Sequence, residues 1–400
     1  MLAEFVTALQ ALVVATVLPQ VARNLNGYAL YGYAFSGYLA AQFILTPFAG
    51  AWADRLGLRR VLLLTYPVLV LGLAFSGSAP TMGVFVAARI VEGAAGGMDS
   101  VIALSSIAKI FPEEQRSRIL ALLSTMWVVP AVIGPAAGAL IAQTIGWRWA
   151  FYAFIPLVAL SAALVIPNVR ETSTTDSHPM DAVKLLFSRS VLLAKRGLPA
   201  GIAAVFFLFA SFFGADAFLP LYLTHERGQP LIIGGLAVML AALGWSLSSL
   251  AVPRLRGSFS TSALVFAAAL LLIGGCAALV VSAIAPIPVA AVLASWILGG
   301  AGIGVSYTTI FSDVFEDAQA GREATVTSTA LMSAMLGMVL GTGLGGLALT
   351  LARNAGRPIG TGILGAFCIA LAAALALAAM SRNVGKAPLR TPEGRDTLPL

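Results

Sequence analysis

The chain has 400 residues, of which 59% are hydrophobic and only 10% are charged. A soluble domain is about a quarter charged, so this composition excludes a soluble globular protein and indicates a chain solvated by lipid. The net charge of +7 would suggest nucleic-acid binding in a soluble protein. Here the basic residues fall in loops between apolar runs, where membrane topology and lipid headgroups explain them.

Apolar runs of about 20 residues, the length that spans a bilayer, recur twelve times along the chain. They lie near residues 2–22, 29–52, 61–79, 82–108, 119–143, 149–167, 199–222, 231–252, 261–284, 288–311, 324–350 and 360–380. The first run has no basic segment before it, so we expect a retained helix rather than a cleaved signal peptide. The sequence therefore predicts an all-α integral membrane protein with twelve transmembrane helices.

An even number of spans places both termini on the same side of the membrane. If that side is cytoplasmic, eighteen Lys and Arg residues face the cytoplasm and five face outward, while Arg89 lies inside a helix. Basic residues favour the cytoplasmic side. We therefore predict a multi-pass protein of the cell (inner) membrane with both termini cytoplasmic.

The first predicted helix ends with LQALVVATVLP, which is similar to the LDxTIVNVALP run of drug exporters in the major facilitator superfamily. Pro19 fits that run, but Gln10 stands where the aspartate is expected, which removes one candidate proton site. Glu4, two turns earlier, is a candidate substitute. A solvated acid at the cytoplasmic end is the competing interpretation of Glu4.

The second helix carries a stripe of Tyr31, Phe35, Tyr38 and Gln42 at i, i+4, i+7 and i+11 spacing. Side chains at this spacing share one helix face, so they are candidates to line a broad, mostly apolar substrate cavity. For Tyr31 and the nearby Tyr28, an aromatic belt at the membrane interface is the alternative.

The polar turn GAWADRLGLRR at 50–60 separates the second and third helices. It resembles the superfamily pattern G-x-x-x-D-R-x-G-R-R/K, which implies a cytoplasmic gate. The residues that fit are Gly50, Asp54, Arg55, Gly57 and Arg59, whereas Leu58 stands where a basic residue is usual. The alternative is a snorkelling basic loop that only sets orientation.

The fourth helix holds the densest buried charge, with Arg89, Glu92 and Asp99 on the same face as Gly93 and Gly96. A charge at mid-membrane costs about 2.5–3.5 kcal/mol or more and is usually kept for function. The segment RIVEGAAGG resembles the superfamily pattern that is linked to proton coupling. The alternative is a permanent Arg89–Glu92 ion pair that braces the helix.

The fifth helix reads WVVPAVIGPAAG, in which Pro130, Gly134 and Gly138 lie one helical turn apart and Pro135 bends the backbone. The G-P-x-x-G segment resembles the antiporter signature of drug/proton exchangers, although Ala137 departs from it. Plain helix packing explains the same spacing.

The longest polar segment divides the chain into a half at 1–167, a linker at 168–198, a second half at 199–382 and a tail at 383–400. The linker contains DAVKLLFSRSVLLAK, a candidate amphipathic helix on the membrane surface. An internal repeat supports the division, because IFPEEQRSR at 110–118 aligns with VFEDAQAGR at 314–322. In the repeat alignment the fourth-helix charges correspond to Leu293, Trp296 and Ile303, so only the first half carries them. We predict two pseudo-symmetric six-helix halves, as in the major facilitator fold.

Asp216 lies within FFGADAFLP of the seventh helix, among Phe212, Phe213 and Phe218. An acid in such apolar surroundings is a candidate to bind a proton, or a cationic substrate between Phe212 and Phe213. A structural, hydrogen-bonded acid near the outer mouth is the alternative.

Several functions are excluded by missing motifs. The chain has no phosphate-binding loop for ATP, its two histidines lie in loops, and its two cysteines form no metal pattern. We expect no enzyme activity, no cofactor, no metal and no nucleic-acid partner.

The resemblance implies a proton-coupled antiporter that exports lipophilic or cationic drugs by alternating access. Protons would neutralise Asp216, Asp99 or Glu92, while Asp54 and Arg55 latch the cytoplasmic side. We expect a monomer. A metabolite or lipid exporter, a proton symporter and a non-transporting receptor remain alternatives.

 The expected partners are therefore a small-molecule substrate, protons and the lipid bilayer.

Overall fold

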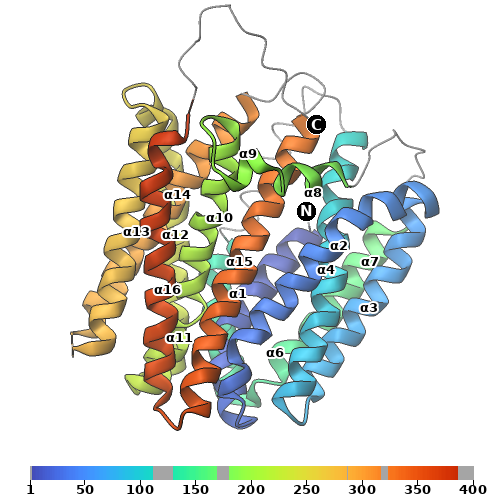
Figure 1. The fold of residues 1–400 in the computed structure, drawn as a ribbon. Helices are drawn as coiled ribbons and strands as arrows, with labels where there is room; N and C mark the ends of the chain where they lie inside the picture. Colours follow the sequence, from blue (N-terminus) through green and yellow to red (C-terminus); the bar gives the residue numbers. More distant parts are fainter. Residues whose placement is uncertain (1, 111–128, 169–179, 286, 317–322, 386–400) are drawn as a thin grey trace, which may run out of the picture.

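The computed structural model describes residues 2–110, 129–168, 180–285, 287–316 and 323–385, and all regular structure in these ranges is helical. Figure 1 shows the chain as one bundle of long helices. The first half contains α1 (Leu2–Asn24), η1 (Tyr28–Leu30), α2 (Tyr31–Leu56), α3 (Leu58–Ser78), α4 (Met82–Ile110), a helix over Val129–Gly146 that ends in the π-helical turn η2 (Ala142–Gly146), α6 (Trp149–Tyr152) and α7 (Phe154–Val165).

Two short helices, α8 (Asp181–Leu186) and α9 (Arg189–Leu192), connect this half to the second. The second half contains α10 (Leu198–Asp216), α11 (Leu219–Leu221), the π-helical turn η3 (Tyr222–Glu226), α12 (Leu231–Arg256), α13 (Thr261–Ile284), α14 (Val289–Glu316), α15 (Glu323–Asn354), α16 (Ile359–Met380) and η4 (Ser381–Asn383). The domain boundaries themselves stay a prediction.

The predicted all-helical membrane fold is confirmed, because each of the twelve ranges falls largely on helix within the residues that the structure describes. Within the described residues, nine helices are long and apolar enough to cross a membrane. The sixth and seventh spans are interrupted, and proline explains both breaks. Pro156 cannot donate to the carbonyl of Tyr152, where α6 ends, and Pro220 cannot donate to that of Asp216, where α10 ends.

Helices within each half approach closely through glycine. A Cβ atom built on Gly93 of α4 would lie 2.0 Å from the carbonyl oxygen of Tyr38 on α2. The corresponding helices of the second half repeat this contact, since a Cβ on Gly300 of α14 would lie 2.1 Å from the carbonyl oxygen of Ala241 on α12. Only glycine allows such short separations, so both halves are assembled in the same way.

Burial separates central helices from peripheral ones. In an apolar 18-residue stretch of the span Leu198–Glu226, which contains α10, 83% is buried inside the protein, whereas the corresponding share in the more apolar span Ile359–Asn383 is only 33%. Exposed apolar side chains need a lipid solvent, and helices can meet lipid because their backbone groups are hydrogen-bonded internally. α16 is therefore peripheral and α10 is central.

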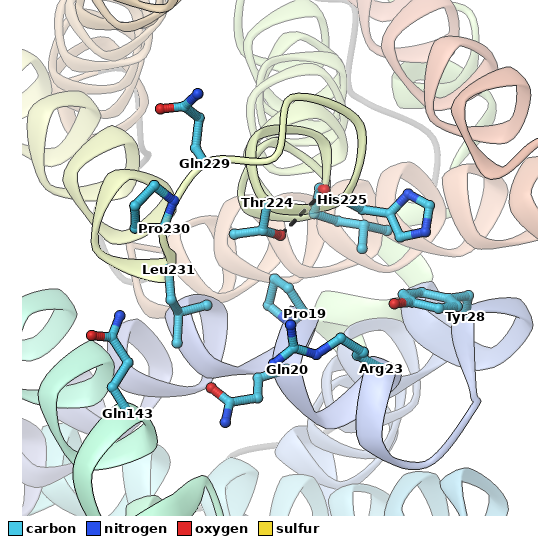
Figure 2. Close-up of a pocket in the computed structure, with 11 residues that line it drawn as sticks. Pro19, Gln20, Arg23, Tyr28, Gln143, Thr224, His225, Gln229, Pro230 and Leu231 are labelled. Atoms are coloured by element: carbon cyan, nitrogen blue, oxygen red, sulfur yellow. Dashed lines mark hydrogen bonds between the residues drawn. The ribbon is translucent and has the colours of Figure 1, made fainter.

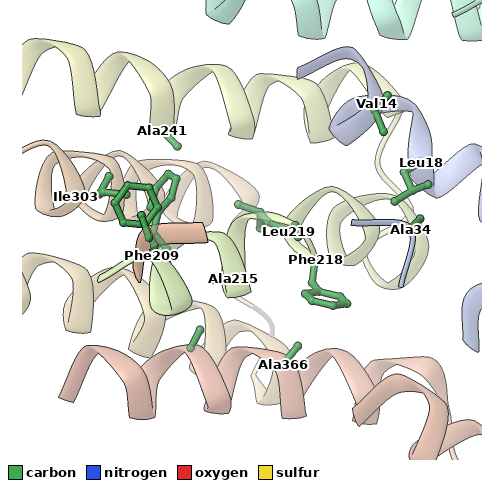
Figure 3. Close-up of a cluster of buried hydrophobic side chains, with 14 of the residues drawn as sticks. Val14, Leu18, Ala34, Phe209, Ala215, Phe218, Leu219, Ala241, Ile303 and Ala366 are labelled. Atoms are coloured by element: carbon green, nitrogen blue, oxygen red, sulfur yellow. The ribbon is translucent and has the colours of Figure 1, made fainter. Parts of the chain in front are cut away.

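The contacts between the two halves cluster at the end of the bundle away from α8 and α9, which we call the far end; the end that carries α8 and α9, at the top of Figure 1, is the linker end. A Cβ on Gly32 of α2 would lie 2.4 Å from the Cα of Gly346 on α15. Nearby, Thr350 Oγ1 donates a hydrogen bond to the carbonyl oxygen of Ala29 at 2.7 Å. Figure 3 shows buried side chains of both halves in this part of the core, including Leu18 of α1 and Phe218.

Candidate functional site

A buried ion pair lies inside the first half. Arg89 is 3% exposed and Glu92 is fully buried, and Arg89 Nη1 lies 2.5 Å from Glu92 Oε2. Two further donors reach the same carboxylate, because Gln10 Nε2 of α1 donates to Oε2 at 2.5 Å and Ser76 Oγ of α3 donates to Oε1. Three helices thus supply partners to one buried acid, as a buried charge requires.

The Arg89 guanidinium also contacts the second helix. Its central carbon lies 4.3 Å from the centroid of the Tyr38 ring, a cation–π geometry. Arg89 Nε is buried and has no hydrogen-bond partner among the described residues. On the other side of the pair, Glu92 packs over Gly72 of α3, where a Cβ would lie 2.6 Å from Glu92 Cγ. The Arg89–Glu92 pair is therefore the centre of a cluster that joins α1, α2, α3 and α4.

Sequence reasoning treated Gln10 as the loss of a proton site and did not identify its role in this cluster. The Gln10 amide donates a hydrogen bond to the carboxylate of Glu92 on α4, 82 residues away in the chain. The signal that was available is the polar residue itself, since an amide inside an apolar helix needs a partner. The sequence analysis also missed Ser76, a second polar residue inside an apolar helix, whose hydroxyl donates to the same carboxylate.

Asp216 forms a second polar site in the other half. It is 9% exposed and accepts a hydrogen bond from Trp296 Nε1 of α14 at 2.8 Å. The Trp296 ring stacks on Phe212 with a centroid distance of 5.3 Å. Trp296 is the residue that aligns with Glu92 in the internal repeat, so each half has a polar interaction at this position of its fourth helix.

Asp216 adjoins the contact between the halves. Tyr31 Oη of α2 donates to the carbonyl oxygen of Ala217 at 2.9 Å, and the Tyr31 ring contacts Phe35 and Phe218. Tyr31 is fully buried. It lies in the closed interface in this conformation, and not in a membrane-interface belt or an open cavity wall.

The other predicted cavity residues are distributed over both halves. Phe35, Tyr38 and Gln42 are half-buried on α2, as is Phe213 on α10, whereas Phe212 is buried against Trp296. The structure adds an aromatic cluster that the sequence did not reveal, because its members come from α10, α12 and α14. Its rings lie 5.6–6.4 Å apart and belong to Phe209, Phe213, Trp245 and Tyr307.

The predicted gate is described only in part. Gly57 lies between α2 and α3 with φ of 84°, a conformation that favours glycine, and Arg59 is exposed. Gly50, Asp54 and Arg55 belong to the last turns of α2, but their surroundings lie outside the described residues. The side chains of Glu4 and Asp99 lie outside them as well.

The fifth-helix residues pack against other helices. Gly134 and Gly138 face Leu12 and Val13 of α1, which matches the interpretation as helix packing. Pro130 is buried in the same helix. Pro135 lies at the contact between halves, since a Cβ on Gly235 of α12 would lie 3.1 Å from Pro135 Cβ.

A polar cavity of about 620 Å³ lies at the far end between the two halves. Figure 2 shows side chains of both halves around it, with Gln20 and Arg23 of α1 on one side and Gln229 on the other. His225 meets Tyr28 edge to face at a centroid distance of 4.9 Å across this boundary. Sequence reasoning named none of these residues as a site, because the cavity exists only where the two halves meet.

Comparison with known proteins identifies the family. A family model described as Major Facilitator Superfamily matches residues 1–342. A Mycobacterium tuberculosis protein named "Probable multidrug-efflux transporter" is 28% identical over 349 residues, which are 73% of this chain and 74% of that protein. "Multidrug resistance protein 3" of Bacillus subtilis is 28% identical over 172 residues, 43% of this chain and 34% of that protein.

The first curated relatives matched align over no more than 34% of their own length. Among solved structures, a variant of the nucleoside transporter NupG has a TM-score of 0.74 at 13% identity, covering 95% of this chain and 98% of that one. At this identity the likeness concerns the fold. Because the family model spans most of the sequence, the chain belongs to the Major Facilitator Superfamily.

Proposed function

We propose that the protein is a proton-coupled antiporter that exports lipophilic or cationic drugs by alternating access. The observation that carries this proposal is Asp216, a buried acid next to the contact between the halves. It accepts a hydrogen bond from the neutral Trp296, and no cation pairs with it among the described residues. A buried carboxylate without a cation is costly to ionise. The protonated and ionised forms of Asp216 therefore differ strongly in free energy within this conformation.

Asp216 is the proton-exchanging group in this proposal, and Glu92 stays paired with Arg89. Protonation of Asp216 removes a charge one residue from Ala217, whose carbonyl oxygen accepts the hydrogen bond from Tyr31 of the other half. The charge state of Asp216 thereby biases the opening of the far end. A drug that binds more strongly to one of the two states is then coupled to the proton.

The substrate class is supported by two observations. Relatives at modest identity carry multidrug names, and aromatic faces of the kind found at Phe213, Trp245 and Tyr307 bind planar and cationic compounds. The orientation belongs to the proposal too. Exposed basic residues at the linker end, among them Arg59 and Arg60, favour a cytoplasmic linker in the cell membrane.

The test uses proteoliposomes with an imposed pH gradient and a panel of lipophilic cations. We expect the gradient to drive uptake of a panel compound in the native protein. Asp216→Asn should abolish the gradient-driven flux but retain exchange of labelled for unlabelled substrate without a gradient. Asp181→Asn, which alters an exposed linker acid, is the matched control and should behave like the native protein.

Other outcomes separate the alternatives. Transport of metabolites or lipids but of no drug would favour a metabolite or lipid exporter, and flux in the same direction as the proton would favour a symporter. Binding without any flux would favour a receptor. Gradient-driven flux that survives in Asp216→Asn would refute the proposed role of this residue.

A further inference from the structure

The linker segment, residues 180–196, exposes large apolar side chains although it lies outside the membrane spans. Leu192 and Leu193 are 66% and 68% exposed, and Met180 and Phe187 are exposed as well. Four such side chains on 17 residues, next to a membrane-spanning bundle, indicate a surface that another partner covers.

The opposite face of the same segment is already occupied. Leu186 and Val191 are buried against Ile202 and Met332 of the second half. The carbonyl oxygen of Ala182 also accepts a hydrogen bond from Thr329 Oγ1 at 3.3 Å. The linker segment is therefore fixed on the second half, and its exposed apolar side chains are not needed for that attachment.

Basic side chains accompany the exposed apolar ones. Lys184, Arg189, Lys195 and Arg196 are all exposed, and Asp181 is the one acid of the segment, 3.5 Å from Lys184. The segment thus combines an apolar surface with an excess of positive charge. This is the composition of interfacial segments that bind anionic lipid.

The position of the segment fits the membrane surface. It ends two residues before Leu198, the first residue of the membrane-spanning α10. Leu192 and Leu193 therefore lie within two helical turns of the point where the chain enters the bilayer. We propose that the linker segment inserts Phe187, Leu192 and Leu193 into the headgroup region and binds anionic lipid headgroups through Arg189, Lys195 and Arg196.

The first half of the bundle is the other surface near enough to cover this segment when the transporter changes state. Its linker end carries the exposed Arg59 and Arg60 at the start of α3. Like charges would then face each other, which opposes docking. Anionic headgroups complement both surfaces, so the charge pattern favours lipid.

The test places an environment-sensitive fluorophore on Leu193→Cys in a Cys368→Ala background, since Cys276 is buried. The full chain is reconstituted in vesicles of phosphatidylcholine alone or of equal parts phosphatidylcholine and phosphatidylglycerol. Quenching by nitroxide lipid reports bilayer contact, and quenching by iodide reports water contact. A label on Arg357→Cys, an exposed far-end position, is the matched control.

We expect the label at position 193 to be quenched by nitroxide lipid and protected from iodide when phosphatidylglycerol is present. Each charge removed from the segment should lower interfacial partitioning by about fivefold. The variant Lys195→Gln/Arg196→Gln should therefore lose most of the nitroxide quenching. Neutralising Arg23 and Arg357 at the far end should leave it unchanged.

Three results would overturn the proposal. Iodide quenching equal to that of the far-end label would mean that the surface faces water. Protection from both quenchers would mean that protein covers it. Nitroxide quenching that is the same with and without phosphatidylglycerol would remove the role of the anionic headgroup. None of these readouts depends on transport, so they test the inference independently of the proposed function.

Discussion

Replacing Gly32 by alanine should favour opening of the far end. A Cβ at this position would lie 2.4 Å from the Cα of Gly346, 2.8 Å from its amide nitrogen and 2.9 Å from the carbonyl oxygen of Thr342. All three are backbone atoms, so α2 and α15 must separate to accommodate the methyl group. The same replacement at Gly346 is milder, because its Cβ would lie 3.0 Å from the Cα of Gly32.

Overpacking of this kind costs about 1–3 kcal/mol. The cost applies only to the state in which the far end is closed, so it shifts the ratio of closed to open molecules by about 5- to 150-fold. Alanine is a better helix former than glycine, so helix propensity does not explain a loss of the closed state.

The assay is a distance measurement between spin labels on Arg23 and Arg357, which are exposed at the far end on opposite halves. We expect Gly32→Ala to move the distance distribution toward longer values, and Gly346→Ala to move it less. Gly83→Ala is the control, since the nearest atom to its Cβ is 4.0 Å away. An unchanged distribution in Gly32→Ala, or an equal change in Gly83→Ala, would refute the reasoning.

Two further predictions concern the buried cluster of the first half. Ser76→Ala removes one donor to Glu92 and should lower stability in thermal unfolding by about 1–3 kcal/mol, whereas Ser78→Ala, at an exposed position on the same helix, should have no measurable effect. Arg89→Met leaves Glu92 buried without its cation and should cost about 3–5 kcal/mol, and the double variant Arg89→Met/Glu92→Met should regain most of that loss. Native transport by the double variant would identify the pair as a brace, and restored stability without transport would identify a functional role.

Much of the fold follows from the sequence because lipid imposes a simple rule on each helix. A span needs about 20 apolar residues, and that requirement is local to the run. The breaks at Pro156 and Pro220 are local too, but the predicted ranges were drawn from apolar length alone and passed through both.

The candidate sites follow less well, because they depend on how separate helices are rotated against each other. The contact between Arg89 and Glu92, which the sequence offered as the alternative to proton coupling, could be foreseen because the two residues lie on one turn of one helix. The Gln10–Glu92 and Asp216–Trp296 hydrogen bonds join residues 82 and 80 positions apart. Spacing along one helix carries no information about such partners, and the apolar stripe of Tyr31 gives no sign that the other half covers it.

The contrast in burial between α10 and α16 has a consequence for how the protein tolerates change. Substitutions along α10 meet other side chains on nearly every face, so a scan of all single replacements should find few neutral ones there. Most positions of α16 are half-buried or exposed, and at the exposed ones, which meet acyl chains, one apolar side chain serves as well as another. Neutral substitutions should therefore accumulate in α16. Substitutions that change substrate preference should instead occur on α10 and the helices packed against it.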